Sequence, residues 1–319
     1  MKKWKTVEMG GNLMKVAAVQ MTVSLAQVEK NLEKAERLLV KAFEQGCEMV
    51  ILPEFFNSAV AFHDKMLKVA SQFEGPTLEL MTEMARRYQG YIGGSFIANR
   101  GGENYNNFVL VFPDGSFAIH DKDQPTMWEN CYYRGGNDDG VVDTPLGPVG
   151  IVMCWEMIRT RAIERLRGKI DLLVGGSCWW TLPDGAIPLP GKRSAERCNR
   201  EIMRETPARL ARLLGVPVIH AAHAGSFEAA MPLVPFLPYR SSFLGETQIV
   251  DGQGNILSRL SQADGEGLAI AEIEPGRVIP SEELPPGFWI PELPALLKMA
   301  WNYQNWHGVR YYNKRHKVK

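Results

Sequence analysis

The sequence predicts an α/β fold, because short apolar runs typical of buried strands recur along the chain with stretches of helical length between them. No repeat, low-complexity segment or flexible linker interrupts the 319 residues, of which 45% are hydrophobic. A chain of this length and composition buries a large core, so one α/β domain is favoured over two.

The first half of the chain alternates predicted strands and helices. A Ser-x-x-Gln capping pattern at Ser24 and Gln27 predicts a helix to about Gly46, and a second helix is expected over 76–88. The strands share short apolar runs that end at polar or turn residues: 15–21, 49–52, 91–98, 106–112 and 117–121.

The second half of the chain repeats this order. Helices are expected at about 159–167 and 192–214, and the Pro-rich stretches 181–191 and 226–240 are predicted to be loops within the same domain. The remaining predicted elements are a hairpin around 251–254 and strands at 149–153, 170–175, 216–222 and 267–273.

Composition excludes several classes of partner. The 36 Lys and Arg residues balance 36 Asp and Glu residues, so no field of one sign is expected to attract nucleic acid. The five cysteines are odd in number and irregularly spaced, which argues against a secreted disulfide framework and favours the cytoplasm. The start of the chain lacks the apolar stretch of a signal peptide, and no apolar run is long enough to span a membrane.

Three chemically active side chains follow directly on three predicted strands. Glu54, Lys122 and Cys154 each lie just past a strand's carboxyl end, which is the edge where α/β sheets usually bind their ligands. A cysteine in a strand-to-helix turn lies near backbone N–H groups that bind an oxyanion and lower the thiol pKa. An inert buried thiol is the alternative for a single cysteine that ends an apolar strand.

Four motifs in this chain resemble those of the nitrilase, or carbon-nitrogen hydrolase, superfamily. The resemblance extends over about residues 14–275, which we treat as the hydrolase domain, with 276–319 as a C-terminal tail. The motifs are Val16-Ala17-Ala18-Val19-Gln20, Ile51-Leu52-Pro53-Glu54, His120-Asp121-Lys122 and Gly150-Ile151-Val152-Met153-Cys154-Trp155-Glu156.

The resemblance implies a four-layer α-β-β-α sandwich and a catalytic Glu-Lys-Cys group, which here is Glu54, Lys122 and Cys154. Glu54 would act as base and then as acid, while Lys122 would stabilise the charge that develops on the substrate. Glu129 matches a second glutamate of the family, although Arg134 stands where a proline is common.

A substrate pocket is expected around this group. Aromatic residues near the motifs are its predicted walls, although each is also an ordinary core residue: Phe55, Trp128, Tyr133, Trp155 and Trp179. The 181–191 and 226–240 stretches are expected to cover it. His220 and His223 share a predicted strand whose two-residue period turns them to opposite faces, so neither a metal nor a cofactor is expected.

The resemblance implies hydrolysis of a carbon–nitrogen bond in a small molecule, with an amide or carbamoyl compound favoured as substrate. Cys154-Trp155-Glu156 resembles the cysteine segment of true nitrilases, which keeps a nitrile as the alternative. Acyl transfer to an amine or alcohol and a catalytically inactive binding protein are further alternatives. Family members pair through helices, so we expect at least a homodimer, with the apolar 276–319 tail packed on a partner subunit.

Overall fold

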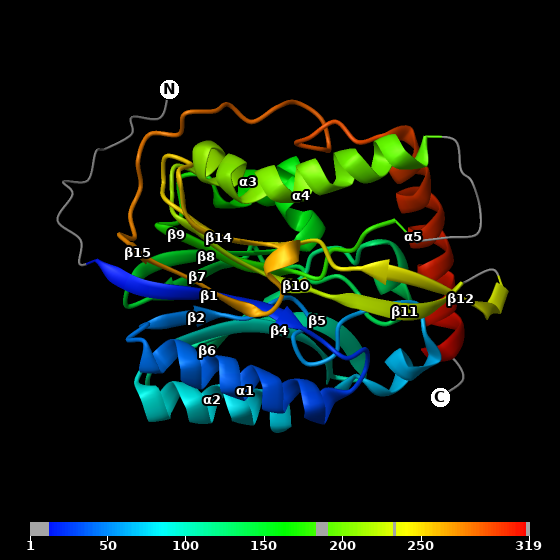
Figure 1. Cartoon of the computed structure of the whole chain (residues 1–319), viewed down its shortest axis with the longest axis horizontal. Coiled ribbons are helices and arrows are strands. Elements are labelled where there is room, and N and C mark those ends of the chain that lie inside the picture. The colour runs from blue at the N-terminus through cyan, green and yellow to red at the C-terminus, as the bar shows by residue number, and fades with distance from the viewer. Residues whose placement is uncertain (1–12, 183–190, 232–233, 317–319) are drawn as a thin grey trace.

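The chain folds into four layers, in which two β-sheets lie between two pairs of helices (Figure 1). The computed structural model describes residues 13–182, 191–231 and 234–316. Helices α1 (Val28–Glu44) and α2 (Pro76–Tyr88) cover one side of the sandwich, and α3 (Thr160–Leu166) and α4 (Lys192–Leu214) cover the other. The α-β-β-α sandwich expected from the sequence is therefore the observed fold.

The strands of the two layers form one continuous path in the order β6-β5-β4-β2-β1-β10-β9-β8-β7. β1 pairs with β10 only at its end, from Gln20 opposite Ala222 to Thr22 opposite Ala224. The strands on the first side of this junction are β1 (Met14–Thr22), β2 (Met49–Ile51), β4 (Tyr91–Arg100), β5 (Glu103–Val111) and β6 (Phe117–Asp121), with the short β3 (Ser71–Gln72) beside β4.

On the second side of the junction, β13 pairs with β10 and β14, while β15 runs antiparallel along β1. The strands of this half are β7 (Val141–Thr144), β8 (Gly147–Met153), β9 (Leu172–Ser177), β10 (Val218–Ala224), β13 (Gly245–Val250) and β14 (Ile256–Ser261), whereas β15 (Gly267–Ile273) belongs with β1 in the first half. Strand β2 is parallel to β1, and β8, β9 and β10 are parallel to one another, so the strands of each set end at a common edge of the sandwich.

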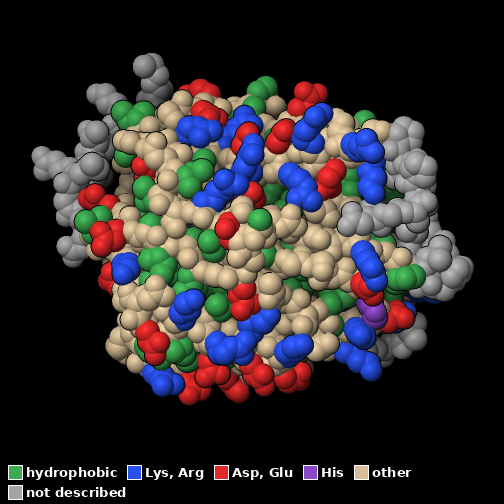
Figure 2. All heavy atoms as spheres, viewed as in Figure 1, with side chains coloured by type: hydrophobic (Ala, Val, Ile, Leu, Met, Phe, Trp, Pro, Cys, Tyr) green, Lys and Arg blue, Asp and Glu red, His purple; other side chains and the backbone are tan. Residues whose placement is uncertain are grey.

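Three apolar cores fill the spaces between the four layers. Side chains such as Leu39 and Val109 pack between α1, α2 and the first sheet, while Ile163 and Leu213 pack between α3, α4 and the second. A third core, which includes Val16, lies between the two sheets. On the face shown in Figure 2, acidic and basic side chains are interspersed, as expected for a chain of zero formal charge.

Two local predictions were wrong. The first helix begins at Val28 and not at Ser24, because Ala26 adopts a left-handed backbone conformation (φ 58°) that no helix accommodates. The 226–240 stretch forms a hairpin, β11 (Ser226–Met231) and β12 (Val234–Ser242), instead of a loop. Its prolines are tolerated because each strand of an isolated two-stranded ribbon has one edge that needs no hydrogen-bond donors.

The tail contains a helix that the sequence analysis did not predict. Helix α5 (Ala295–His316) stands at one end of the sandwich, beside the β11–β12 hairpin (Figure 1). Within the chain it packs on η2 (Met127–Cys131), a 3-10 turn, where Asn305 accepts hydrogen bonds from Met127 and Asn130 and the His307 ring contacts Trp128. Packing of the tail on a partner subunit stays a prediction. Among the described residues, no helix is long and apolar enough to cross a membrane.

Candidate active site

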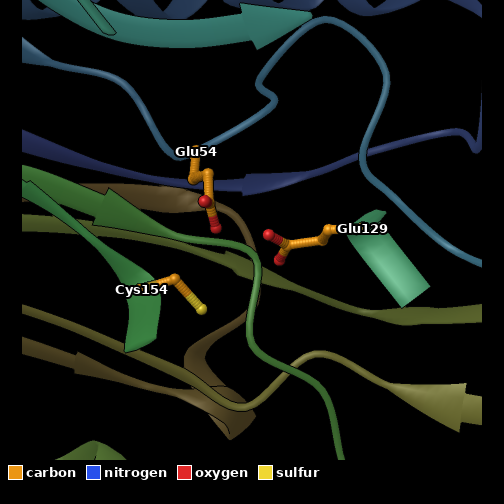
Figure 3. A group of neighbouring side chains, drawn as sticks. All are labelled: Glu54, Glu129 and Cys154. Carbon is orange, nitrogen blue, oxygen red and sulfur yellow. The ribbon is translucent and has the colours of Figure 1, made fainter. Parts of the chain in front are cut away.

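Three strand ends bring the predicted catalytic residues together. β2, β6 and β8 end at Ile51, Asp121 and Met153, and Glu54, Lys122 and Cys154 follow within a few residues. Figure 3 shows Glu54, Glu129 and Cys154 pointing into a common space, and their nearest sulfur and carboxylate oxygen atoms all lie within 4.8 Å of one another. Together, the four residues Glu54, Lys122, Glu129 and Cys154 form what we call the site cluster.

Lys122 lies between the two carboxylates of the site cluster. Its Nζ donates to Glu54 Oε1 at 2.8 Å and to Glu129 Oε2 at 2.7 Å, and all three side chains are fully buried. Burial alone would lower the pKa of Lys122, but the charges of Glu129 and Glu54 raise it above its usual value. Lys122 is therefore an ammonium ion held in place between Glu54 and Glu129.

The Glu54 carboxylate is held on both oxygens. Oε1 also accepts from Asn106 Nδ2 at 2.9 Å, and Oε2 accepts from the backbone N–H of Cys178 at 3.0 Å. Burial raises the pKa of Glu54, and the attraction of Lys122 only partly opposes it, so that the pKa lies at about 7. Such a carboxyl group exchanges its proton near neutral pH, as a general base and acid must.

The backbone around Glu54 is fixed by His223 and Gly176. Burial lowers the pKa of His223 to about 4, and the neutral ring donates from Nε2 to the Glu54 carbonyl oxygen at 2.7 Å. Gly176 of β9 passes so close that a Cβ there would lie 2.6 Å from the Glu54 nitrogen. The sequence analysis considered His223 only as a possible metal ligand, so it missed this role as a positioning residue.

Cys154 begins η3 (Cys154–Ile158) in a strained backbone conformation. Its φ is 48°, and Phe55 and Met127 have φ of 52° and 53° beside the other members of the site cluster. Non-glycine residues in this region cost free energy and gather at functional sites. Burial, followed by the charge of Glu54, raises the pKa of the Cys154 thiol well above its usual value, so the lowering expected from the strand-to-helix turn is wrong. The cysteine is thus protonated at rest and needs a base.

Glu129 is as firmly held as Glu54. Its Oε2 accepts from the backbone N–H of Thr126 at 2.8 Å and from the Tyr133 hydroxyl group, in addition to Lys122. Tyr133 and Phe55 are almost fully buried and contact each other with ring centroids 5.9 Å apart. Both aromatic rings thus lie in the core behind the carboxylates, and neither lines the cavity beside Cys154.

A second buried group of ions, here called the supporting cluster, lies next to the site cluster in sequence. Its members are His120, Asp123, Asp138, Glu156, Arg159 and Arg165. Glu156 accepts from the backbone N–H of Met153 at 2.9 Å and of Asp123 at 2.9 Å. One carboxylate therefore ties the segment that carries Cys154 to the segment that carries Lys122.

A cavity of about 170 Å³ opens beside Cys154 and Glu129. Three of the predicted aromatic walls, Trp128, Trp155 and Trp179, line it. Tyr239 of the hairpin and Leu182 also line it, whereas residues 183–190 of the expected 181–191 cover and the side chains of 231–237 lie outside the described part of the chain. A larger surface hollow along α4 contains no member of the site cluster.

A metal ion at the site cluster would have to replace Lys122. Glu54, Glu129 and Cys154 have ligand atoms close enough for one ion, but the ammonium group already contacts an oxygen of each carboxylate. The two histidines have different partners. His220 Nε2 pairs with Ser177 Oγ at 2.8 Å, whereas His223 Nε2 contacts the backbone carbonyl oxygen of Glu54. The expectation of a metal-free, cofactor-free site stays a prediction.

Comparison with known sequences gives partial matches. A nitrilase from Pyrococcus abyssi is 31% identical over 162 residues, which are 48% of this chain and 62% of that protein. An omega-amidase, NIT2-B, from Xenopus laevis is 31% identical over 155 residues, which are 45% of this chain and 55% of that protein. The matched part thus spans about half to three-fifths of these relatives.

Solved structures share the fold over most of the chain. A carbon-nitrogen hydrolase from Helicobacter pylori G27 superposes with a TM-score of 0.65 at 19% identity, covering 82% of this chain and 89% of that one. A mutant amidase from Nesterenkonia sp. AN1 in complex with acrylamide gives 0.65 at 17% identity, covering 83% and 92%. The carbon-nitrogen hydrolase family model matches residues 15–177, about half of the sequence, and these residues hold the whole site cluster. The chain is a member of the carbon-nitrogen hydrolase family.

Proposed function

We propose that this protein hydrolyses a carbon–nitrogen bond of a small molecule through a thioester on Cys154. The observation that carries the proposal is the convergence of Glu54, Lys122, Glu129 and Cys154 within a few ångströms at the edge of an aromatic cavity. A thiol, a base that titrates near neutrality and a fixed cation are the groups that acyl transfer to a nucleophile requires.

In the first half of the reaction, the Cys154 sulfur attacks the substrate carbon while its proton passes to Glu54. The negative charge that develops on the substrate oxygen is stabilised by Lys122 and by the backbone N–H of Trp155. The carbon–nitrogen bond then breaks, and Glu54 gives the proton to the departing nitrogen. A thioester on Cys154 remains.

In the second half, water attacks the thioester. Glu54, ionised again, accepts a proton from the water and returns it to the sulfur as the carbon–sulfur bond breaks. The products are the carboxylic acid and the free Cys154 thiol. Glu129 accepts a hydrogen bond from Lys122 and holds the ammonium group in place.

We propose an amide or carbamoyl compound as substrate, with a nitrile as the second candidate. The relatives support both, since one is named a nitrilase and another an omega-amidase. The Cys154-Trp155-Glu156 segment favours the nitrile. A nitrile would form a thioimidate with Cys154, and addition of one water would release ammonia and give the same thioester.

The proposal is tested by measuring ammonia release from panels of amides, carbamoyl compounds and nitriles, together with the intact mass of the protein during turnover. We expect an acyl adduct that is absent in Cys154→Ser, which should keep its fold and lose nearly all activity. Cys198→Ser, a partly buried cysteine that does not line the cavity, is the matched control.

Other outcomes separate the remaining alternatives. Transfer of the acyl group to an added amine in preference to water would identify an acyltransferase. No adduct and no product with any member of the panels would indicate a binding protein. Unchanged turnover in the Cys154→Ser variant would refute the thioester mechanism.

A homo-oligomer is also proposed. Its support is the outer face of α5, where Met299, Trp306 and Val309 are exposed by 68%, 54% and 47%. Large apolar side chains gathered on one surface are typical of protein interfaces. Sedimentation of the wild type and of Met299→Glu should show dissociation in the variant, whereas identical masses would exclude this face.

A further inference from the structure

The cavity beside Cys154 is lined on one side by the C-terminal helix. Leu297, Ala300 and Gln304 line it together, at intervals of three and four residues that place them on one face of α5. The opposite walls are tryptophans, including Trp128 and Trp179. Among the described residues that line the cavity, Glu129 is the only Asp or Glu and none is Lys, Arg or His, so an anionic substrate group would meet no cationic partner there.

α5 is fixed firmly in this position. Trp301 stacks on Trp155, the residue after Cys154, with ring centroids 5.4 Å apart and planes within 6°. Asn305 Oδ1 accepts from the backbone N–H of Met127 at 2.7 Å. Gly308 approaches Asn130 so closely that a Cβ there would lie 2.6 Å from the Asn130 Cβ. A wall held this firmly has its shape before the substrate binds.

One polar atom on this wall has no partner. The side-chain oxygen of Gln304 forms no hydrogen bond with any described residue and faces no open space in this conformation, so a ligand in the cavity reaches it when the terminal amide of this lining side chain rotates. A buried amide oxygen without a partner is costly, and it favours any ligand that supplies a donor. The size of the cavity suits one ring, since a protein cavity of roughly 150 Å³ binds benzene.

We propose that α5 is the specificity wall of this enzyme, and that Gln304 hydrogen-bonds a hydroxyl group on a single aromatic ring of the substrate. The inference rests on the proposed function and names its substrate class: an uncharged amide or nitrile whose acyl part carries one hydroxylated ring. A hydroxyl group pairs with either end of the Gln304 amide, because it both donates and accepts.

The test compares kcat/KM for phenylacetamide, its three ring-hydroxylated isomers and propionamide. We expect at least one hydroxylated isomer to exceed phenylacetamide by about tenfold, the contribution of one hydrogen bond. Gln304→Leu should abolish this preference, so that the hydroxylated isomers and phenylacetamide have equal kcat/KM in the variant. Asn302→Leu, on the exposed side of α5, is the matched control and should retain the preference.

A second variant tests the wall itself. Ala300→Leu adds bulk to the cavity face and should lower kcat/KM for all four aromatic amides by about tenfold or more relative to propionamide. Equal turnover of hydroxylated and plain rings in the wild type, or a preference that survives in Gln304→Leu, would overturn the proposal.

Binding distinguishes failure of this inference from failure of the proposed function. In Cys154→Ala, the tryptophans of the cavity report occupancy through their fluorescence. If a hydroxyphenylacetamide binds the double variant Cys154→Ala, Gln304→Leu about tenfold more weakly than it binds Cys154→Ala, the result supports the wall even if no turnover is found. Turnover of propionamide without any binding of the aromatic amides would support the proposed function and refute the wall.

Discussion

The site cluster and the supporting cluster use the same kinds of charged groups and give them opposite properties. In the site cluster, Lys122 is the single cation that faces two carboxylates, and the pKa of Glu54 is raised to about 7. In the supporting cluster, burial alone would raise the pKa of Glu156, but His120 and Arg159 hold it well below its usual value. Burial alone would lower the pKa of His120, yet Glu156 and Asp138 raise it to about 10.

The difference lies in the number of partners each carboxylate has. Glu156 is surrounded by several cations and two backbone donors, so it stays ionised and rigid at any ordinary pH. Glu54 shares one cation with Glu129 and therefore remains able to take up a proton. In the site cluster the carboxylates outnumber the cation, so one carboxyl group can take up a proton. In the supporting cluster the acidic and basic groups are balanced, so they stay ionised and hold the two segments together.

The largest effect is expected when the supporting cluster loses the carboxylate of Glu156. Glu156→Gln leaves His120 with Asp138 and Arg165 with Asp123 as their remaining acidic partners, removes the one fully buried carboxylate of the cluster, and should cost on the order of 3–5 kcal/mol of unfolding free energy. Urea denaturation measures the change. Glu164→Gln, on the exposed side of α3, should stay within about 0.5 kcal/mol. A stable Glu156→Gln protein that has lost only activity would contradict the assignment.

Removing the cation of the site cluster should act on catalysis instead. Lys122→Met preserves most of the side-chain volume and should lower kcat/KM by about 10²–10³, the usual consequence of losing one donor to a developing oxyanion. Lys169→Met, a half-exposed lysine 3.9 Å from Asp139, is the control. Steady-state kinetics measure the change in kcat/KM. More than a tenth of wild-type activity in Lys122→Met would contradict a catalytic role for the cation of the site cluster.

The two clusters should also respond to pH with opposite signs. Because its folded pKa is raised, Glu54 stabilises the fold below its unfolded value of 4.5, and this contribution is lost as pH rises through about 7. Because its folded pKa is depressed, Glu156 contributes above pH 4.5 and loses the contribution as pH falls. Unfolding free energies of the wild type and Glu54→Gln should therefore diverge between about pH 4.5 and 7.

The kcat/KM of the wild type should rise with pH and reach a plateau at alkaline pH. The midpoint of this rise should lie near pH 7, because only ionised Glu54 accepts the thiol proton. A pH-rate profile on a neutral substrate shows this. A profile that is flat from pH 5 to pH 9 would mean that another group is the base.

The smallest effect is expected at Asn106. Asn106→Leu removes the amide donor to Glu54 Oε1, which stabilises the carboxylate, so the midpoint of the pH-rate profile should move up by about one unit. The plateau should change little. Asn99→Leu, a partly exposed asparagine near the end of β4, should leave the midpoint in place, and an unmoved midpoint in Asn106→Leu would show that the amide does not tune Glu54.

The sequence predicted those parts of the site that depend on strand ends. Glu54, Lys122 and Cys154 could be placed because each follows a regular apolar run, and parallel strands bring their carboxyl ends to one edge. The helices predicted near 76–88 and 192–214 agree with α2 and α4. Local patterns of this kind fix the layers of the fold.

Features that depend on contacts between distant segments could not be predicted. Asn106 lies in the middle of a strand, and no spacing relates it to Glu54. Helix α5 escaped because its apolar residues are spread around the helix, with one face on η2 and another on the cavity, so no single stripe marks it. Tertiary packing creates these roles.

The position of α5 in the chain also matters during synthesis. Every strand of the sandwich leaves the ribosome before Ala295–His316, so the catalytic group can assemble while the cavity still lacks one wall. Until Trp301 stacks on Trp155, two tryptophans that are buried in the finished protein stay open to solvent and to chaperones. The docking of α5 thus buries apolar surface that the strands alone leave open.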